Sequence, residues 1–215
     1  MKASLPEMWE REENLGPKTL MHTKNWKRRL LSTMLLTALN ASSFAVDHYK
    51  IDADHTATSF QYSRWGFSMQ HGSFDNTSGF IEIDPDTKTG TIDIDISTAS
   101  VNTGSDAVNR TLRSSVFFDS KRHPDIRFIS SRLIFDGDVL KQVEGNLTIK
   151  GITHPVTLGV DHFNCGSILI NGKRTCGANG ALKILRSDYN LGRYVPFLSD
   201  AVTFSIVVAA IKDSP

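Results

Sequence analysis

The feature that most constrains the fold of this chain is a strict alternation of apolar and polar residues near its middle. Side chains of a β-strand point alternately to the two faces of the sheet, so a period of two is typical of a half-buried strand. Residues 91–97 read TIDIDIS and predict such a strand, with its isoleucines facing a core and its aspartates facing solvent. The apolar side holds Ile92, Ile94 and Ile96, and the polar side holds Asp93, Asp95 and Ser97.

The same alternation recurs in shorter runs along the chain. Turn dipeptides such as Asp136-Gly137, Lys150-Gly151 and Asn171-Gly172 separate these runs at hairpin spacing. The final run, residues 202–211, is apolar on both sides, which predicts a strand that is covered on both faces or meets a helix or a partner. The other predicted strands contain Phe60 and Tyr62, Phe80, Ile81 and Ile83, Ile126 and Phe128, Leu147 and Ile149, Val156, Leu158 and Val160, and Leu182 and Ile184.

One segment follows a helical period instead. Over residues 105–118, Val108, Leu112 and Val116 recur at every fourth position, and Ser105 or Asp106 is suited to cap the start. The segment predicts one helix. About eight strands and a single helix, without the strand and helix alternation of a parallel sheet, indicate an all-β fold. The antiparallel sheet is expected to close into a barrel or to fold into a sandwich.

The first 45 residues differ from the rest. Basic residues between Lys24 and Arg29 precede an apolar run, and a tripeptide of the small-x-small type ends at Ala45, as in a secretory signal peptide. The alternative is a transmembrane anchor, which needs about 20 apolar residues, roughly twice the run present. We therefore expect three segments. The actual start is Met21, which begins a signal peptide (21–45); residues 1–20 are an upstream extension, and residues 46–215 form one mature domain.

The charge balance argues against nucleic-acid binding. The chain has 24 Lys and Arg and 23 Asp and Glu, of which residues 1–45 hold 7 and 4. The mature domain therefore carries 17 basic and 19 acidic residues, a net charge of −2 with neutral histidines. A nucleic-acid-binding domain needs a basic surface that displaces counterions from the phosphates. We exclude that class of function.

Both cysteines of the chain, Cys165 and Cys176, lie in the mature domain. Export to an oxidising compartment favours a disulfide between them. Because several glycines surround the pair, we expect it to staple a hairpin whose turn lies near Asn171-Gly172. A metal pair or a redox-active site is the alternative, although the sequence has neither C-x-x-C spacing nor a third ligand nearby.

The sequence contains no recognisable catalytic motif. The six histidines of the mature domain are scattered one per segment, without the spacing that puts two metal ligands on one face. There is also no nucleophile elbow and no glycine-rich phosphate loop. The sequence therefore predicts neither a metal site nor a catalytic centre.

Aromatic and basic residues offer a binding site instead. Phe117, Phe118 and Phe128 lie in or beside the helical segment, and an eight-stranded barrel is wide enough to hold one apolar ligand. The alternative is that these rings fill the core. Arg113, Arg186 and the pair Arg64-Trp65 adjoin apolar positions, where a guanidinium can bind an anionic head group at a cavity mouth. Each arginine is otherwise an ordinary surface residue.

From residue 49 to about residue 210, essentially the whole mature domain, the sequence resembles the YceI family of exported, lipocalin-like, polyisoprenoid-binding proteins. Five stretches carry the resemblance, and their common order makes it specific. The Cys165 and Cys176 pair resembles that of a subgroup with a stapled hairpin. In chain order the stretches read YKIDADHTATSF, WGFSMQHGSF, TLRSSVFFDSKRHPDIRFISS, GNLTIKGITHPVTL and RSDYNLG.

The resemblance implies a single antiparallel lipocalin-like barrel around a long apolar channel, in which an amphiphile lies tail first. In such relatives the ligand is an isoprenoid chain with a polar or phosphorylated head, or a quinone. Arg64 stands where relatives often have histidine. The motifs shared with the family imply which residues of this chain contact the ligand. These residues are Trp65 and Phe67 in the WGF motif, Leu112 and Arg113 in LRS, Phe117 and Phe118 in FFD, and Arg186 and Tyr189 in RSD.

The implied function is that of a periplasmic binding or carrier protein without enzymatic activity. A prenyl phosphate, a quinone or a similar lipid would be its ligand, and no further cofactor is expected. Transient membrane contact and a homodimer are further expectations. One alternative is an enzyme that acts on a lipid inside the barrel, with His55, His71 or a buried aspartate as acid or base. Another is a secreted interaction module with a filled core.

Overall fold

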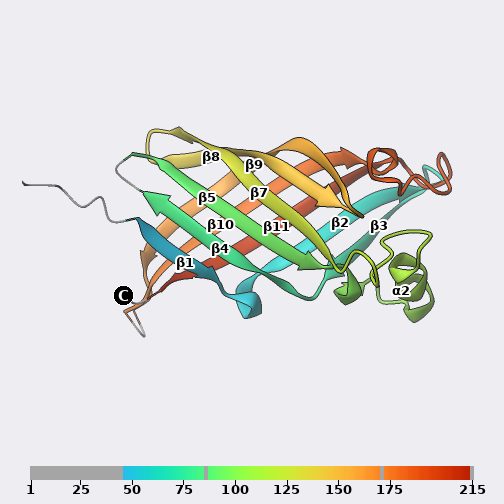
Figure 1. The fold of residues 1–215 in the computed structure, drawn as a ribbon, viewed down its shortest axis with the longest axis horizontal. Coiled ribbons are helices and arrows are strands. Elements are labelled where there is room, and N and C mark those ends of the chain that lie inside the picture. The colour runs from blue at the N-terminus through green and yellow to red at the C-terminus, as the bar shows by residue number, and fades with distance from the viewer. Residues whose placement is uncertain (1–45, 85–86, 170–171, 214–215) are drawn as a thin grey trace, which may run out of the picture. The chain divides into compact units, whose positions relative to one another are not determined.

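The computed structural model describes residues 46–84, 87–169 and 172–213. The predicted signal peptide and the extension before it lie outside these residues, as does Asn171 of the predicted turn. Figure 1 shows the strands and the helix α2 (Asp106–Arg113). The strands are β1 (Asp47–Ile51), β2 (Ala57–Arg64), β3 (Ser68–Phe74), β4 (Thr77–Asp84), β5 (Thr89–Ser97), β6 (Val101–Asn102), β7 (Asp125–Asp136), β8 (Val139–Ile149), β9 (Ile152–Ser167), β10 (Arg174–Leu185) and β11 (Ala201–Lys212).

Eight of these strands form a closed antiparallel barrel. Their order is β1, β4, β5, β7, β8, β9, β10 and β11, and β11 pairs again with β1. The pairing of β11 with β1 closes the sheet on itself, and closure is how a barrel limits edge-to-edge aggregation. The prediction of an all-β barrel of about eight strands with one helix is confirmed, and the sandwich alternative is wrong.

Strand β11 pairs with two successive strands, β1 and β2, at different positions along its length. The 3₁₀ turn η1 (Ala53–His55) bends the chain between β1 and β2. Strand β11 therefore pairs with β1 near Lys212 and with β2 near Phe204. Strands β2 and β3 extend the wall toward α2, where β3 pairs with β6 (Figure 1).

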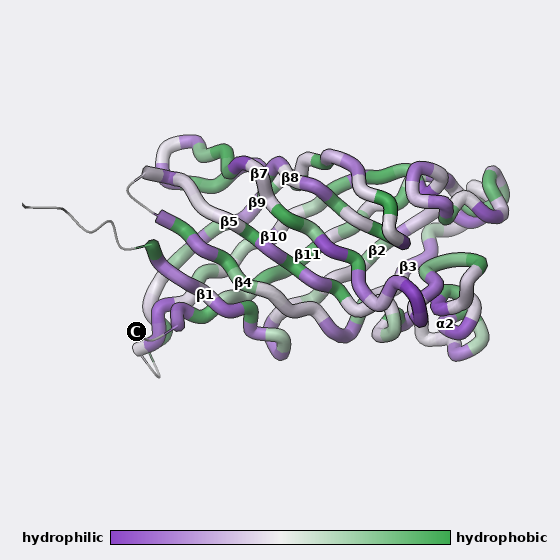
Figure 2. The backbone as a smooth tube through the Cα atoms, viewed as in Figure 1, coloured by the Kyte–Doolittle hydropathy of each residue, from purple (hydrophilic) through white to green (hydrophobic). Residues whose placement is uncertain are grey.

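The alternating pattern of residues 91–97 forms β5, as predicted. Ile92, Ile94 and Ile96 are only 5–7% exposed, and hydrophobic and hydrophilic positions alternate along the strands in Figure 2. The expectation that the aspartates face solvent is wrong for Asp93, which is buried. The guanidinium of Arg127 on β7 covers Asp93 and donates two hydrogen bonds to its carboxylate, at 3.1 and 2.6 Å.

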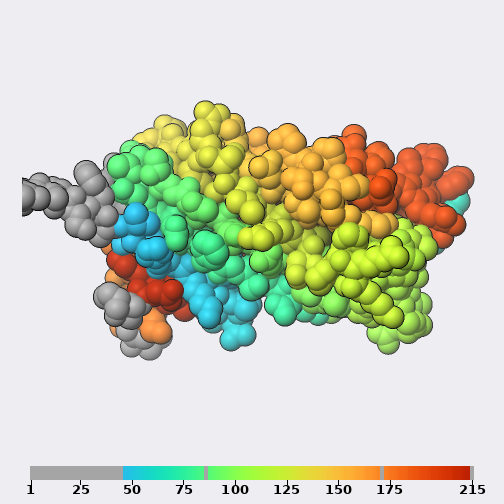
Figure 3. Space-filling model, in the orientation of Figure 1, coloured from blue at the N-terminus to red at the C-terminus, as the bar shows by residue number. Residues whose placement is uncertain are grey.

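The helix is shorter than predicted. It ends at Arg113, because both the amide and the hydroxyl of Ser114 donate to the carbonyl of Thr111 instead of continuing the helix. Val108 and Val116 are exposed, at 39% and 42%, and only Leu112 of the predicted apolar face packs against the core. The two phenylalanines that follow, Phe117 and Phe118, therefore lie in a turn and are buried. In Figure 3 the α2 segment (yellow-green) and the loop after β10 (red) lie together at one end of the barrel.

Candidate ligand-binding cavity

A cavity of ≈ 580 Å³ lies at the α2 end of the barrel. Its volume falls in the range of about 300–1,000 Å³ that is usual for small-molecule sites. Strands, α2 and the loop between β10 and β11 all contribute to the wall. The lining residues are Phe60, Tyr62, Arg64, Trp65, Gln70, His71, Thr103, Ser105, Ala107, Val108, Thr111, Leu112, Phe117, Phe118, Ile184, Arg186, Leu191, Tyr194, Phe197, Leu198, Val202 and Phe204.

Three phenylalanines that line the cavity, Phe60, Phe118 and Phe204, pack against a fourth, Phe74, which does not line it. Phe60 of β2 lies 5.5 Å from Phe74 of β3 and 6.2 Å from Phe204 of β11, measured between ring centroids. Phe118, from the turn after α2, meets Phe74 edge to face at 5.6 Å. Aromatic pairs in such geometry are attractive beyond the area they bury. The cluster therefore gives the cavity part of its apolar wall.

A second and much smaller cavity of ≈ 50 Å³ lies deeper in the barrel. Its wall includes Phe128, Ile126 and Leu147, and Phe204 lines both cavities. The side chain of Phe204 therefore lies between the large cavity and the apolar space beyond it.

Six of the ten ligand-binding residues predicted from the sequence line the large cavity: Arg64, Trp65, Leu112, Phe117, Phe118 and Arg186. The other four lie elsewhere. Phe67 is 93% exposed, and Phe128 faces the small cavity. Arg113 donates to the carbonyl of Ala99 at 3.2 Å and does not line the large cavity. Tyr189 is 1% exposed and packs edge to face on His154.

Arg186 is a buried cation that organises the loop between β10 and β11. Burial lowers the pKa of its guanidinium, while the nearby Asp200 carboxylate opposes that shift. Asp200 in turn accepts hydrogen bonds from Ser187, which lower the pKa of its carboxyl group. The guanidinium donates to the carbonyl oxygens of Leu191, Arg193, Leu198 and Ser199 at 2.6–3.3 Å. Most of its donors are thus committed to backbone, and few remain for a ligand.

Arg64 differs from Arg186 in its surroundings. It lies at the end of β2, is exposed, and lines the large cavity. Within the described part of the chain its guanidinium has no side-chain or backbone partner. Arg64 is therefore the cation of the lining that is available to an anionic group at the cavity mouth.

Two segments that are distant in the sequence meet at the mouth of the cavity. The amide of Trp65 donates to the carbonyl of Phe197 at 2.7 Å. The two rings also pack with their centroids 4.5 Å apart. Phe197 and Tyr194 both line the cavity, although neither was predicted from the sequence to bind a ligand. They lie in a segment without strand periodicity. The signals that could have indicated them are their aromatic side chains and their nearness in sequence to Arg186.

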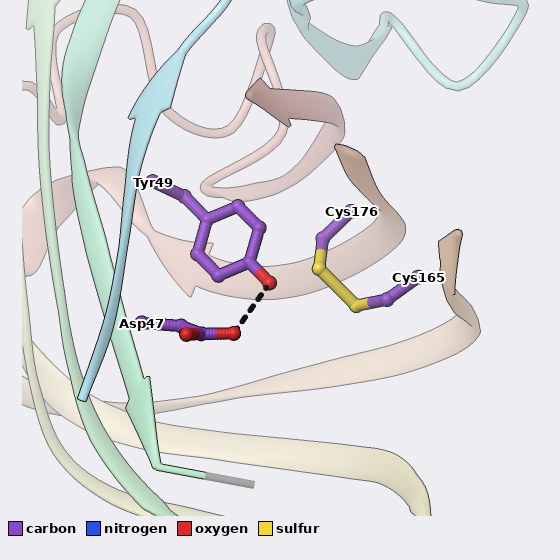
Figure 4. The surroundings of a disulfide bond; sticks show 4 residues. All are labelled: Asp47, Tyr49, Cys165 and Cys176. Carbon is purple, nitrogen blue, oxygen red and sulfur yellow. Dashed lines mark hydrogen bonds between the residues drawn. A yellow bond between two sulfur atoms is a disulfide. The ribbon is translucent and has the colours of Figure 1, made fainter. Parts of the chain in front are cut away.

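The predicted disulfide between Cys165 and Cys176 is confirmed. The cysteines are directly opposite each other on β9 and β10. Because the disulfide bond occupies both sulfur atoms, neither cysteine is free to bind a metal. Figure 4 shows Tyr49 and Asp47 of β1 facing this disulfide, with the Tyr49 hydroxyl donating to Asp47. All four residues line a third cavity of ≈ 390 Å³.

The Asp47 carboxylate also accepts a hydrogen bond from Lys212 of β11. This bond holds the pKa of Asp47 below its ordinary value. Burial, by contrast, raises the pKa of Tyr49. The pair of Asp47 and Lys212 thus links the first and last strands where the barrel closes.

The described residues contain no group of three His, Cys, Asp or Glu side chains placed to hold a metal ion. His71 lines the large cavity. His55 does not; its ring is exposed and bonds Asp52 at 2.9 Å. Among the described residues that line the cavity, none is an aspartate or glutamate. Across the same residues, no helix is both long enough and apolar enough to span a membrane.

Comparisons with known proteins agree with this architecture. A family model described as a YceI-like domain matches residues 49–210. Protein YceI of Escherichia coli O6:H1 is 31% identical over 192 residues, which cover 86% of this chain and 98% of that relative. The crystal structure of Burkholderia cenocepacia BcnA has a TM-score of 0.63 and 25% identity, covering 74% of this chain and 98% of that one. A polyisoprenoid binding domain from Saccharophagus degradans shares the fold, with a TM-score of 0.59 and 19% identity over 77% of this chain and 98% of that one.

Proposed function

Because the chain belongs to the YceI family, we propose that it is a carrier protein of the periplasm that holds one isoprenoid lipid in the large cavity. The ligand class is a polyisoprenoid with a polar or phosphorylated head, or a quinone. The observation that carries the proposal is the cavity of ≈ 580 Å³, whose lining includes the packed rings of Phe60, Phe118 and Phe204. The name of the Saccharophagus degradans domain, which shares the fold, points to the same ligand class.

The cavity suggests how the lipid lies. The tail enters first and rests on the rings of Phe60, Phe118 and Phe204, where apolar side chains replace water. The head remains at the mouth beside Arg64, where a phosphate can accept charge-assisted hydrogen bonds. A cavity of this size also argues against an interaction module with a filled core.

Carriage also fits the energetics of a long tail. At roughly 0.8 kcal/mol per buried CH₂ group, a tail of many carbons transferred from water would exceed any known affinity. In a cell the tail comes from a membrane, where it is already buried. Net affinity then depends on packing and head-group contacts, which permits both uptake and release.

We infer a binding role and no chemistry on the ligand. Acid and base catalysis needs titratable groups that face the reacting atoms. His71 is the only imidazole of the cavity lining, and a carboxylate partner is missing among the described lining residues. The lipid is the only bound group that the proposal requires. The disulfide fits export to an oxidising compartment such as the periplasm.

A fluorescence titration tests the proposal. Trp65 is the only tryptophan of residues 46–215 and lines the cavity. Adding a polyprenol or a prenyl phosphate in detergent should change the emission of the exported protein and saturate at one ligand per chain. A straight-chain alcohol of matched length should bind more weakly. The absence of a saturable change with prenols, prenyl phosphates and quinones would overturn the proposal.

A further inference from the structure

Exposed apolar side chains gather on two segments at the mouth of the large cavity. One segment, residues 64–69, contains the turn between β2 and β3, and the other, residues 193–197, lies in the loop before β11. We call these segments together the mouth face. Large apolar side chains grouped on a surface indicate a binding partner. On the mouth face they are Trp65 (54% exposed), Phe67 (93%), Met69 (52%), Tyr194 (51%), Val195 (41%) and Phe197 (52%).

The two segments form one continuous surface. Besides the ring and amide contacts between Trp65 and Phe197, the backbone of Arg64 pairs with that of Leu198. The amide of Ser199 also donates to the carbonyl of Ser63 at 2.8 Å. Trp65, Tyr194 and Phe197 line the cavity as well, so the face surrounds the opening. Figure 1 places both segments at the α2 end of the barrel.

The charge of this face is positive, although the mature domain as a whole is slightly acidic. Residues 64–69 and 193–197 contain Arg64 and Arg193 and no aspartate or glutamate. The Arg193 guanidinium lies 5.4 Å from the centre of the Tyr194 ring. Tryptophan, tyrosine and arginine, each with an apolar body and a polar or charged tip, are the side chains that settle at a membrane interface. Basic residues add attraction to anionic lipid head groups.

We propose that the mouth face docks the barrel on an anionic membrane surface, with the cavity opening toward the lipid. Docked in this way, a prenyl tail passes between bilayer and cavity without crossing water. This purpose rests on the proposed carrier function, whereas the docking itself rests on the exposed rings and arginines. A second copy of this chain or a partner protein is the competing occupant, and the test separates these from a membrane.

Flotation with lipid vesicles tests the docking. The exported protein should float with vesicles of phosphatidylethanolamine and phosphatidylglycerol, and less with vesicles of phosphatidylcholine alone. Phe67→Ser removes the most exposed ring of the face without touching the cavity and should weaken vesicle binding about tenfold or more. Arg193→Gln should weaken it about fivefold on anionic vesicles only, and this difference should vanish at high salt.

Leu169→Ser is the matched control. Leu169 is as exposed as Phe67, at 101%, but lies in the turn between β9 and β10 at the opposite end of the barrel. It should float like the wild type. Equal losses for Phe67→Ser and Leu169→Ser, or a wild type that fails to float, would overturn the proposal. So would a dimer in ultracentrifugation that Phe67→Ser dissociates while vesicle binding stays unchanged.

Polyprenol binding in detergent separates this inference from the carrier function. Phe67→Ser should bind polyprenol as the wild type does but take it up from vesicles more slowly. If the protein binds no prenol and its flotation still depends on Phe67, the docking stands and the carrier function falls. If prenol binding is normal and flotation is absent, the carrier function stands and the docking falls.

Discussion

The ring of Phe118 meets the ring of Phe74 edge to face, with the centroids 5.6 Å apart. Phe74 ends β3, whereas Phe118 belongs to the turn after α2. This contact fixes the α2 segment to the barrel wall and leaves part of the Phe118 side chain facing the cavity. The same ring thus contributes to the fold and to the proposed binding site.

Replacement of Phe118 should separate these two contributions. Because Phe118 borders the cavity, Phe118→Ala should cost less stability than the roughly 3–5 kcal/mol of a fully packed phenylalanine, while ligand retention falls clearly. Phe128→Ala is the control, since Phe128 borders only the small cavity, and should cost more stability. Urea unfolding and retention of bound prenol measure the two effects. A full core penalty for Phe118→Ala with unchanged retention would favour a filled core.

Phe204 should limit the length of tail that the barrel accepts. It lines both the large and the small cavity, so Phe204→Ala should join the two spaces. We expect the variant to gain affinity for longer prenols relative to shorter ones, as measured by titration with a series of chain lengths. Leu147→Ala enlarges only the small cavity and should leave the preference unchanged. The same length preference in all three proteins would contradict this role.

The arginines should divide into structural and ligand-binding groups. In the wild type the Arg186 guanidinium donates hydrogen bonds to backbone carbonyls. Arg186→Gln leaves these carbonyls without this donor and should destabilise the fold by about 2 kcal/mol or more. Arg64→Gln should change stability by less than about 0.5 kcal/mol but weaken binding of a prenyl phosphate, with little effect on the uncharged prenol. Arg113→Gln should preserve the ratio of the two affinities, because Arg113 contacts Ala99 outside the cavity.

Affinities for phosphate and prenol, taken in detergent at fixed salt, measure this ratio in each variant. If Arg64→Gln weakens both ligands equally, its guanidinium does not bind the head group. An unchanged ratio in every variant would indicate a neutral head group such as that of a quinone.

Acid should weaken the closure of the barrel at Asp47. Its carboxyl pKa is lowered in the folded protein, chiefly by the hydrogen bond from Lys212. The stabilisation is therefore complete above the ordinary pKa of 3.8 and disappears as the pH falls through the lowered value. Asp47→Asn should lower the melting temperature at neutral pH and converge with the wild type in strong acid. Asp138→Asn, which removes a 98% exposed partner of Lys88, should have little effect at any pH. A constant difference between Asp47→Asn and wild type across the acid range would contradict this account.

Local sequence patterns predicted most of the barrel. Period-two alternation located β5, and the dipeptide Lys150-Gly151 formed the predicted turn because both residues adopt positive φ, at 52° and 76°. The end of the helix was not predictable from the apolar period. It depends on Ser114, whose hydroxyl and amide both bond the carbonyl of Thr111, and this local competition interrupts an otherwise helical pattern.

The candidate site was only partly predictable, because nearness in sequence does not decide which way a side chain points. Trp65 lines the cavity while Phe67, two residues away, points into solvent. Leu112 lines the cavity and Arg113 does not, since successive residues of a helix face different directions. The burial of Arg186 depends on carbonyls from a loop that folds back over it, and no sequence pattern records that contact.

Mass spectrometry under non-denaturing conditions, on the protein purified from its own host, tests the central claim most directly. The carrier account predicts one bound lipid per chain, whose fragments identify a chain of isoprene units, and its loss from the Phe118→Ala variant. A protein that carries no lipid, or carries only straight-chain fatty acids or phospholipids, would contradict the account.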